Sequence, residues 1–227
     1  FFDSLTAYVM VVLFLGLSGL FTWLVGSNIF VNNKANMGVF FGIAYWSLFF
    51  FIPALTMKMV AEENRLGTIE LLTTKDVTDG QIIRGKFFAC LILILISLLC
   101  TVPYYITISQ LGNIDDGAVI GGYFGLLFLS GAYVAIGLFA SSITTNQIVA
   151  FLVALFMGIF FHLLFDVMGT SATGPLGSFF NYLSMRVHFD SISRGVVDSR
   201  DIVYFGSIMT LGLYSAELML SKRNWQS

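Results

Sequence analysis

Six continuous apolar runs limit what this chain of 227 residues can fold into more than any other feature. The hydrocarbon core of a lipid bilayer is about 30 Å thick and needs about 20 apolar residues to be crossed by a helix. The runs do not alternate between apolar and polar residues, which disfavours the strands of a membrane barrel. They cover residues 5–25, 39–60, 87–111, 118–140, 148–168 and 202–220. We therefore expect an all-α membrane protein, with six transmembrane helices in one domain spanning residues 1–227.

Composition supports a chain that is surrounded largely by lipid. Charged residues make up only 11% of the sequence, against about 25% in soluble proteins, and the mean hydropathy is +0.89. No basic run indicates a nucleic-acid partner. The first residue is Phe1 rather than methionine, so we expect a further segment upstream.

One strongly polar stretch, residues 61–86, separates the second and third apolar runs. A short apolar cluster lies inside it, at Leu66, Ile69, Leu71 and Leu72. A polar connection does not need such a cluster for solubility. An exposed amphipathic segment of this kind either docks into the groove of a partner protein or lies on the membrane surface, and the residues alone leave both interpretations open.

The distribution of basic residues predicts the orientation of the spans. Lysine and arginine gather in the short loops on the cytoplasmic side of a membrane. The 61–86 stretch contains four of them, whereas the connection between the third and fourth runs carries Asp115 and Asp116 and no base. Six spans then place both termini and the 61–86 loop in the cytoplasm. Arg186, Arg194 and Arg200 conflict with this rule unless the acids around them neutralise their charge.

The last external stretch, residues 169–201, is too long for a simple connection. It opens with helix breakers and then becomes apolar, which predicts a re-entrant pair of short helices, buried in protein or facing water. Asp190 and Arg194 stand four residues apart and can pair on one helical turn. Gly195 can end that turn, and Asp198 or Ser199 can cap the sixth span.

Two motifs resemble known membrane proteins. The pattern E-E-x-x-x-G-T-x-E-L-L resembles the first cytoplasmic loop of ABC-2 type transporter permeases, although Asp76 and Val77 stand where that family usually has a proline. The pattern F-D-S-I-S-R-G-V-x-D-x-R-D, ending at Asp201, is similar to the gliding-motility-associated permease subunits of the F type. The similarity extends over essentially the whole chain.

This resemblance implies a function and a set of partners. The chain would be the permease subunit of an ATP-driven exporter in the bacterial inner membrane, not catalytic by itself, within a type V exporter-like fold. Its partners would be a separate ABC ATPase, which carries ATP and Mg, a second permease copy or a related permease, membrane lipid, and a periplasmic or membrane accessory protein. The implied coupling helix, which docks on the ATPase, would use Glu62, Glu63, Gly67, Thr68, Ile69, Glu70, Leu71 and Leu72. The implied external segment would include Asp190, Arg194, Gly195, Asp198 and Arg200.

His162 and Asp166 form a possible polar pair inside the membrane. They lie four residues apart in the fifth run, so that one helical face presents both. Ionisable groups inside a membrane are candidates for function, here an ion-coupled secondary transporter. The alternative is that Asp166, near the outer end of the run, reaches water or an arginine of the external segment. With two histidines in the chain and no further ligands at suitable spacing, a metal site is disfavoured.

Several enzyme motifs are absent from the sequence. No G-x-x-x-x-G-K-[ST] loop is present for binding ATP, and neither H-E-x-x-H nor G-x-S-x-G occurs. ATP hydrolysis would therefore belong to a partner. A third possibility is a membrane anchor that holds an ATPase complex without moving a substrate.

Overall fold

The computed structural model describes residues 5–25, 36–68, 78–196 and 198–224, and this part of the chain is helical with no strand. Five helical segments are long and apolar enough to cross a membrane, and residues 7–23 form a shorter apolar helix. The expected all-α membrane fold is confirmed. The helices are α1 (Leu5–Trp23), α3 (Gly38–Thr56), α4 (Ala61–Leu66), α6 (Asp79–Leu99), α7 (Val102–Leu111), α8 (Asp116–Ile143), α9 (Gln147–Ile159), the π-helical turn η1 (Phe160–Leu164), α10 (Phe165–Ser171), α11 (Pro175–Leu183), α12 (Met185–Ser193) and α13 (Ser199–Asn224).

The third span begins earlier than the apolar run that predicts it. The helix α6 starts at Asp79 rather than near Phe87, so the end of the 61–86 stretch is helix and not loop. The cause is a capping box: the Thr78 hydroxyl accepts from the Gln81 backbone N–H, and the Gln81 side chain accepts from the Thr78 N–H. These bonds satisfy amide groups that have no partner at a helix start.

The same span is interrupted near its far end. The helix α6 ends at Leu99, and α7 begins at Val102 with a proline in its first turn. Pro103 has no N–H and so cannot continue the backbone hydrogen bonds of α6, whereas proline is well tolerated at a helix start. The third span therefore consists of two helices.

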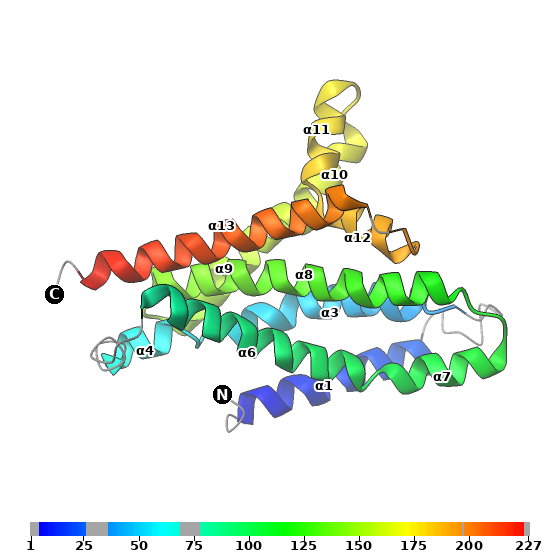
Figure 1. Ribbon diagram of the computed structural model, residues 1–227, viewed down its shortest axis with the longest axis horizontal. Helices are drawn as coiled ribbons and strands as arrows, with labels where there is room; N and C mark the ends of the chain where they lie inside the picture. The colour runs from blue at the N-terminus through cyan, green and yellow to red at the C-terminus, as the bar shows by residue number, and fades with distance from the viewer. Residues whose placement is uncertain (1–4, 26–35, 69–77, 197, 225–227) are drawn as a thin grey trace.

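The centre of the bundle is α8, which is buried along most of its length. It packs against α3, α6, α9, α12 and α13 (Figure 1). Glycine allows these close contacts. A Cβ atom at Gly137 would lie 2.8 Å from Cβ of Thr56, and one at Gly121 would lie 3.0 Å from Cα of Gly195. Gly195 itself has a φ of 83°, in the left-handed region that glycine adopts without strain.

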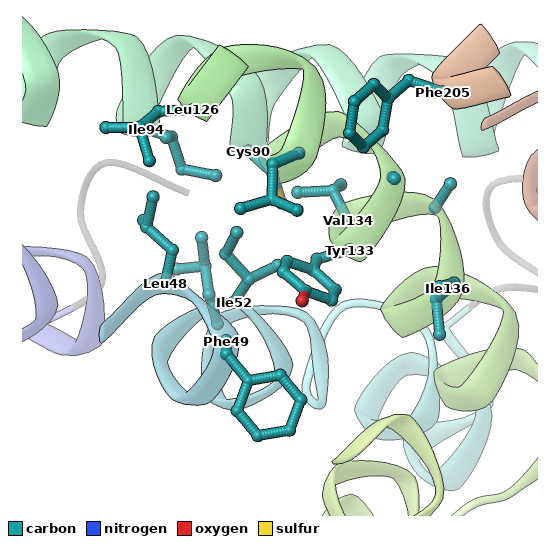
Figure 2. Close-up of a cluster of buried hydrophobic side chains, with 14 of the residues drawn as sticks. Leu48, Phe49, Ile52, Cys90, Ile94, Leu126, Tyr133, Val134, Ile136 and Phe205 are labelled. Atoms are coloured by element: carbon teal, nitrogen blue, oxygen red, sulfur yellow. The ribbon is translucent and has the colours of Figure 1, made fainter. Parts of the chain in front are cut away.

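The apolar core forms where four spans face one another. Figure 2 shows Leu48 and Ile52 of α3, Ile94 of α6, Leu126 of α8 and Phe205 of α13 in this cluster. All five side chains are buried. The core therefore fixes α3, α6, α8 and α13 as one unit, on which both ends of the bundle are built.

The Gly121→Ala substitution tests the close packing of α8. Its new methyl group would meet backbone atoms of Ile192 and Gly195, which cannot rotate away. We expect a loss of about 1–3 kcal/mol in stability, which is typical of overpacking. Thermal unfolding of the detergent-solubilised protein measures it. The control is Gly206→Ala, because a Cβ at Gly206 meets no other atom within 4 Å. Equal midpoints for both variants would contradict the packing argument.

Candidate functional site

The short helix α4 lies at the end of the bundle near both chain termini (Figure 1). It follows α3 after a short turn and contains Glu62 and Glu63 of the proposed coupling set. Gly67 ends it with a φ of 68°, and its N–H bonds to the carbonyl of Glu63. The Thr68 hydroxyl donates to the same carbonyl at 3.4 Å. Ile69, Glu70, Leu71 and Leu72 lie outside the described residues, so their predicted role stays a prediction.

The first turn of α4 is attached to α8 through Ser141. The hydroxyl oxygen of Ser141 accepts from the backbone N–H groups of Val60 and Ala61, at 3.1 and 3.0 Å, and donates to the carbonyl of Met57 at 3.0 Å. One serine thus satisfies amide groups that a helix start leaves without partners. This places α4 directly against the end of the central helix.

A second attachment joins α4 to α6 through Lys86. The ammonium group of Lys86 donates to the carbonyl of Met59 at 2.6 Å and forms an ion pair with Glu63 at 2.5 Å. The lysine side chain is only 14% exposed, so water screens this pair less than a surface pair. The first turn of α6 also contacts α13, because the side chain of Glu217 in α13 lies against Gly80 in α6. A Cβ atom added at Gly80 would lie 2.8 Å from the carboxyl carbon of Glu217.

One side of α4 is left open. Arg65 and Leu66 are exposed, and Leu66 keeps 62% of its surface accessible. Glu62 is half-buried beside them. Within the described part of the chain, α4 is therefore attached on the side that faces the spans and exposed on the other.

The opposite end of the bundle carries residues 169–201, the stretch predicted to be external, and its described residues fold mainly as helices. The α10 and α11 pair projects away from the bundle, and α12 lies along α8 (Figure 1). His188 attaches α12 to α13: its Nδ1 lies 2.6 Å from Asp201 Oδ1, and its Nε2 lies 2.9 Å from the carbonyl of Tyr182. Because a carbonyl oxygen only accepts, Nε2 donates to the Tyr182 carbonyl. Its ring also stacks on Tyr204 with centroids 3.9 Å apart.

The ion pairs of the external segment differ from the predicted ones. Asp190 pairs with Arg186 at 3.7 Å, so the expected Asp190–Arg194 pair is wrong. Arg186 also contacts Asp166 at 3.3 Å. Burial raises the pKa of the Asp190 carboxyl, an effect that the nearby Arg186 opposes.

The connection between α12 and α13 follows the prediction more closely. Gly195 lies just past the end of α12 with a positive φ, as a helix terminator does. Asp198 caps α13 by accepting from the backbone N–H of Arg200 at 3.0 Å. That hydrogen bond lowers the pKa of the Asp198 carboxyl. Arg200 itself is exposed beside this cap.

His162 lies in an aromatic pocket inside the bundle. Its Nδ1 is hydrogen-bonded to the Tyr133 hydroxyl, and its ring stacks on Tyr45 and Phe49 at centroid distances of 4.1 and 4.6 Å. The other ring nitrogen, Nε2, is buried without a hydrogen-bond partner in the described structure, as is the hydroxyl of Tyr45. The π-helical turn at Phe160–Leu164 contains His162, and such turns are frequent at functional sites.

The structure gives His162 and Asp166 different partners. Asp166 forms an ion pair with Arg186 of α12, whereas His162 is bonded to Tyr133 of α8. No hydrogen bond between His162 and Asp166 in the described structure supports the expectation that they act as one polar pair. Across the described residues, no group of three His, Cys, Asp or Glu side chains is arranged to hold a metal ion.

Sequence reasoning missed Lys86 and His188 as attachment points. Their partners are Met59 and Glu63 for the lysine, and Asp201 and Tyr182 for the histidine. No helical spacing joins residues that lie 27 positions apart, as Lys86 and Met59 do. In the sequence, only the position of Lys86 just before an apolar run indicated that it could be an attachment point.

Removing the hydroxyl of Tyr133 tests whether the His162 pocket is structural. Tyr133→Phe leaves both nitrogens of His162 without a partner, and we expect a loss of about 1 kcal/mol in stability. The double variant Tyr133→Phe with His162→Phe removes both polar groups and should recover most of that loss. Thermal unfolding of the unmodified protein, the two single variants and the double variant completes a double-mutant cycle. Additive losses would contradict the pairing.

Comparison with known proteins identifies the family of the chain. Residues 6–202 match the family described as ABC-2 family transporter protein. No curated protein matches the chain significantly. The match covers the spans from α1 to α9 and includes α4 and the external segment, but it reaches only the first residues of α13. The chain is a multi-pass membrane protein and belongs to the ABC-2 transporter family.

Proposed function

We propose that this chain is the permease subunit of an ATP-driven exporter and that α4, with the residues after it, receives force from a separate ABC ATPase. The observation that carries the proposal is the attachment of α4 to α6 and α8 on one side, with Arg65 and Leu66 exposed on the other. A helix held only by its chain ends would bend under load. One bonded to two spans transmits a push to them.

The contacts define a path for that push. Movement of α4 reaches α6 through the Lys86–Glu63 ion pair and reaches α8 through Ser141. The contact of Glu217 with Gly80 extends the path to α13. ATP and Mg would bind to the partner ATPase, whose closure on ATP would tilt these spans and open a route for the substrate.

The remaining parts of the proposal follow from the resemblance. A single unit of this kind encloses no obvious path, so a second copy or a related permease would complete the exporter. The α4 end would face the cytoplasm with both termini, in a bacterial inner membrane. The motif that ends at Asp201 supports a role in gliding motility, and the α11 end would be the surface for a periplasmic accessory protein.

Leu71→Asp and Leu72→Asp test the docking surface. We expect each to abolish recovery of an ABC ATPase when the tagged chain is purified from its native membranes in mild detergent, because a buried carboxylate without a partner opposes binding. Mass spectrometry identifies the ATPase by its P-loop. The matched control is Val196→Asp, at the other end of the bundle, where the side chain is 67% exposed.

Two results would contradict the docking role. Recovery of the ATPase with all three variants would place docking elsewhere on the chain. If no ATPase were recovered with the unmodified chain, the ion-coupled alternative through His162 would gain support, because its Nε2 lies buried and without a partner among the described residues.

Lys86→Met tests transmission separately from docking. The methionine keeps an apolar stem but removes the bonds to Met59 and Glu63. We expect the ATPase to remain bound, while the change in its hydrolysis rate caused by the membrane subunit is lost. Reconstituted complexes measure both quantities. Lys86→Arg retains a cation and should retain partial coupling; full coupling in the methionine variant would exclude this path.

A further inference from the structure

A cavity opens at the end of the bundle opposite α4, between the starts of α3 and α8 and the helix α12. Its volume is about 370 Å³. Phe41 and Phe189 form part of its wall. The polar side chains in the lining are those of Asn36, Asp115, Asp190 and Ser193. No lysine or arginine lines it among the described residues. The cavity therefore combines two carboxylates with aromatic and aliphatic surface.

The aromatic part of the wall is held in place by α8. A Cβ atom at Gly122 would collide with the ring of Phe41, and one at Gly125 would lie 3.1 Å from the ring of Phe189. Both rings therefore rest directly on the backbone of the central helix. A wall of this kind is formed before any ligand arrives, which lowers the cost of binding.

The cavity continues along α3 into a second hollow. This hollow of about 500 Å³ lies along α1 and α3, with Phe21, Ile43 and Trp46 among its lining residues. The two hollows share Gly38 and Gly42. A Cβ atom at Gly42 would meet nothing within 4 Å, so no side chain fills the space on α3 where the two hollows join. One end of the combined groove is thus acidic, and the other is apolar.

The carboxylates keep capacity for a ligand. Asp115 uses Oδ1 to cap α8 through the N–H of Ala118, and its side chain stays exposed. Asp190 has one ion-pair partner, Arg186, at the long distance of 3.7 Å, and Arg186 is also shared with Asp166. Arg194 is a second cation near Asp190. Asp115 and Asp190 both line the cavity, so a cation bound there would lie beside two carboxylates.

We propose that this groove binds an amphiphilic cation, with a positively charged amine or ammonium head between Asp115 and Asp190 and an aliphatic tail along α1 and α3. Carboxylates attract the charge, and aromatic surfaces such as Phe41 and Phe189 favour ammonium groups. The apolar hollow removes the tail from water. This site is separate from α4, and the proposal goes beyond coupling to an ATPase.

Direct binding of hexyltrimethylammonium to the full chain tests the site without any ATPase. The protein is placed in nanodiscs of phosphatidylcholine, and binding is measured by equilibrium dialysis with empty nanodiscs as the background. We expect saturable binding that weakens as salt increases. Hexyl sulfate has the same tail and the opposite charge and should not bind. Tetramethylammonium has the head alone and should bind more weakly.

Two sets of variants locate the probe. The double variant Asp115→Asn with Asp190→Asn should weaken binding by about tenfold, while asparagine preserves the cap of α8. Its control is Asp116→Asn, a neighbouring acid outside the cavity lining. Gly42→Leu fills the junction and should reduce binding of the tailed probe to that of tetramethylammonium. Gly16→Leu is the matched control, because a Cβ at Gly16 also meets nothing within 4 Å.

Specific outcomes would overturn the proposal. Equal binding of hexyl sulfate would show a simple apolar surface rather than a cation site. Unchanged affinity in the double aspartate variant would show that the head group does not bind in this cavity. Unchanged affinity in Gly42→Leu would show that the tail does not lie in the groove. Folding of each variant is checked by its thermal unfolding midpoint in the same nanodiscs.

Discussion

The close approach of α8 to its neighbours is the constraint on which the rest of the structure depends. Lipid tails are as apolar as leucine side chains, so spans associate through packing rather than by escaping from water. In this chain, small residues on α8 let the surrounding helices come near, and side chains such as Thr56 and Phe41 fill the space at Gly137 and Gly122. The burial of α8 along most of its length follows from these contacts.

Each end of α8 organises a polar assembly. At the end near the termini, Ser141 holds the start of α4, and Lys86 of α6 holds α4 from a second direction. At the other end, Gly121 permits contact with the α12–α13 connection, and the His188–Asp201 pair joins those two helices. The proposed transmission relies on this central helix, which has a polar attachment near each end.

Polar groups inside the bundle are few, and most of them are paired. Ser97 and Ser130 donate to backbone carbonyls of their own helices, and Thr101 bonds to Tyr123. His162, Tyr45 and Thr22 differ, because each keeps a buried polar atom without a hydrogen-bond partner in the described structure. An orphaned group costs more in an apolar interior than at a surface, and the pocket formed by His162 and Tyr45 holds two of them.

The acidic cavity near α12 depends on the same central helix. Phe41 and Phe189 reach its wall from α3 and α12, and both rings rest on glycines of α8. Because those glycines also set the spacing of the spans, the shape of the cavity is linked to the packing of the bundle. A change in the position of α3 or α12 would alter the cavity directly.

The sequence by itself determined the helical membrane fold, because runs of apolar residues long enough to cross a bilayer leave the backbone few other ways to satisfy its hydrogen bonds. It also indicated the polar 61–86 stretch, the glycine that ends α12 and the acid that caps α13, since these depend on neighbouring residues alone. The sequence also offered an arginine of the external segment as a partner of Asp166, and the structure identifies it as Arg186. Only the tertiary structure decided the partners of Lys86, His188 and His162, and where α6 meets α13. These contacts join residues from different helices, and their geometry is set by how closely α8 lets those helices approach.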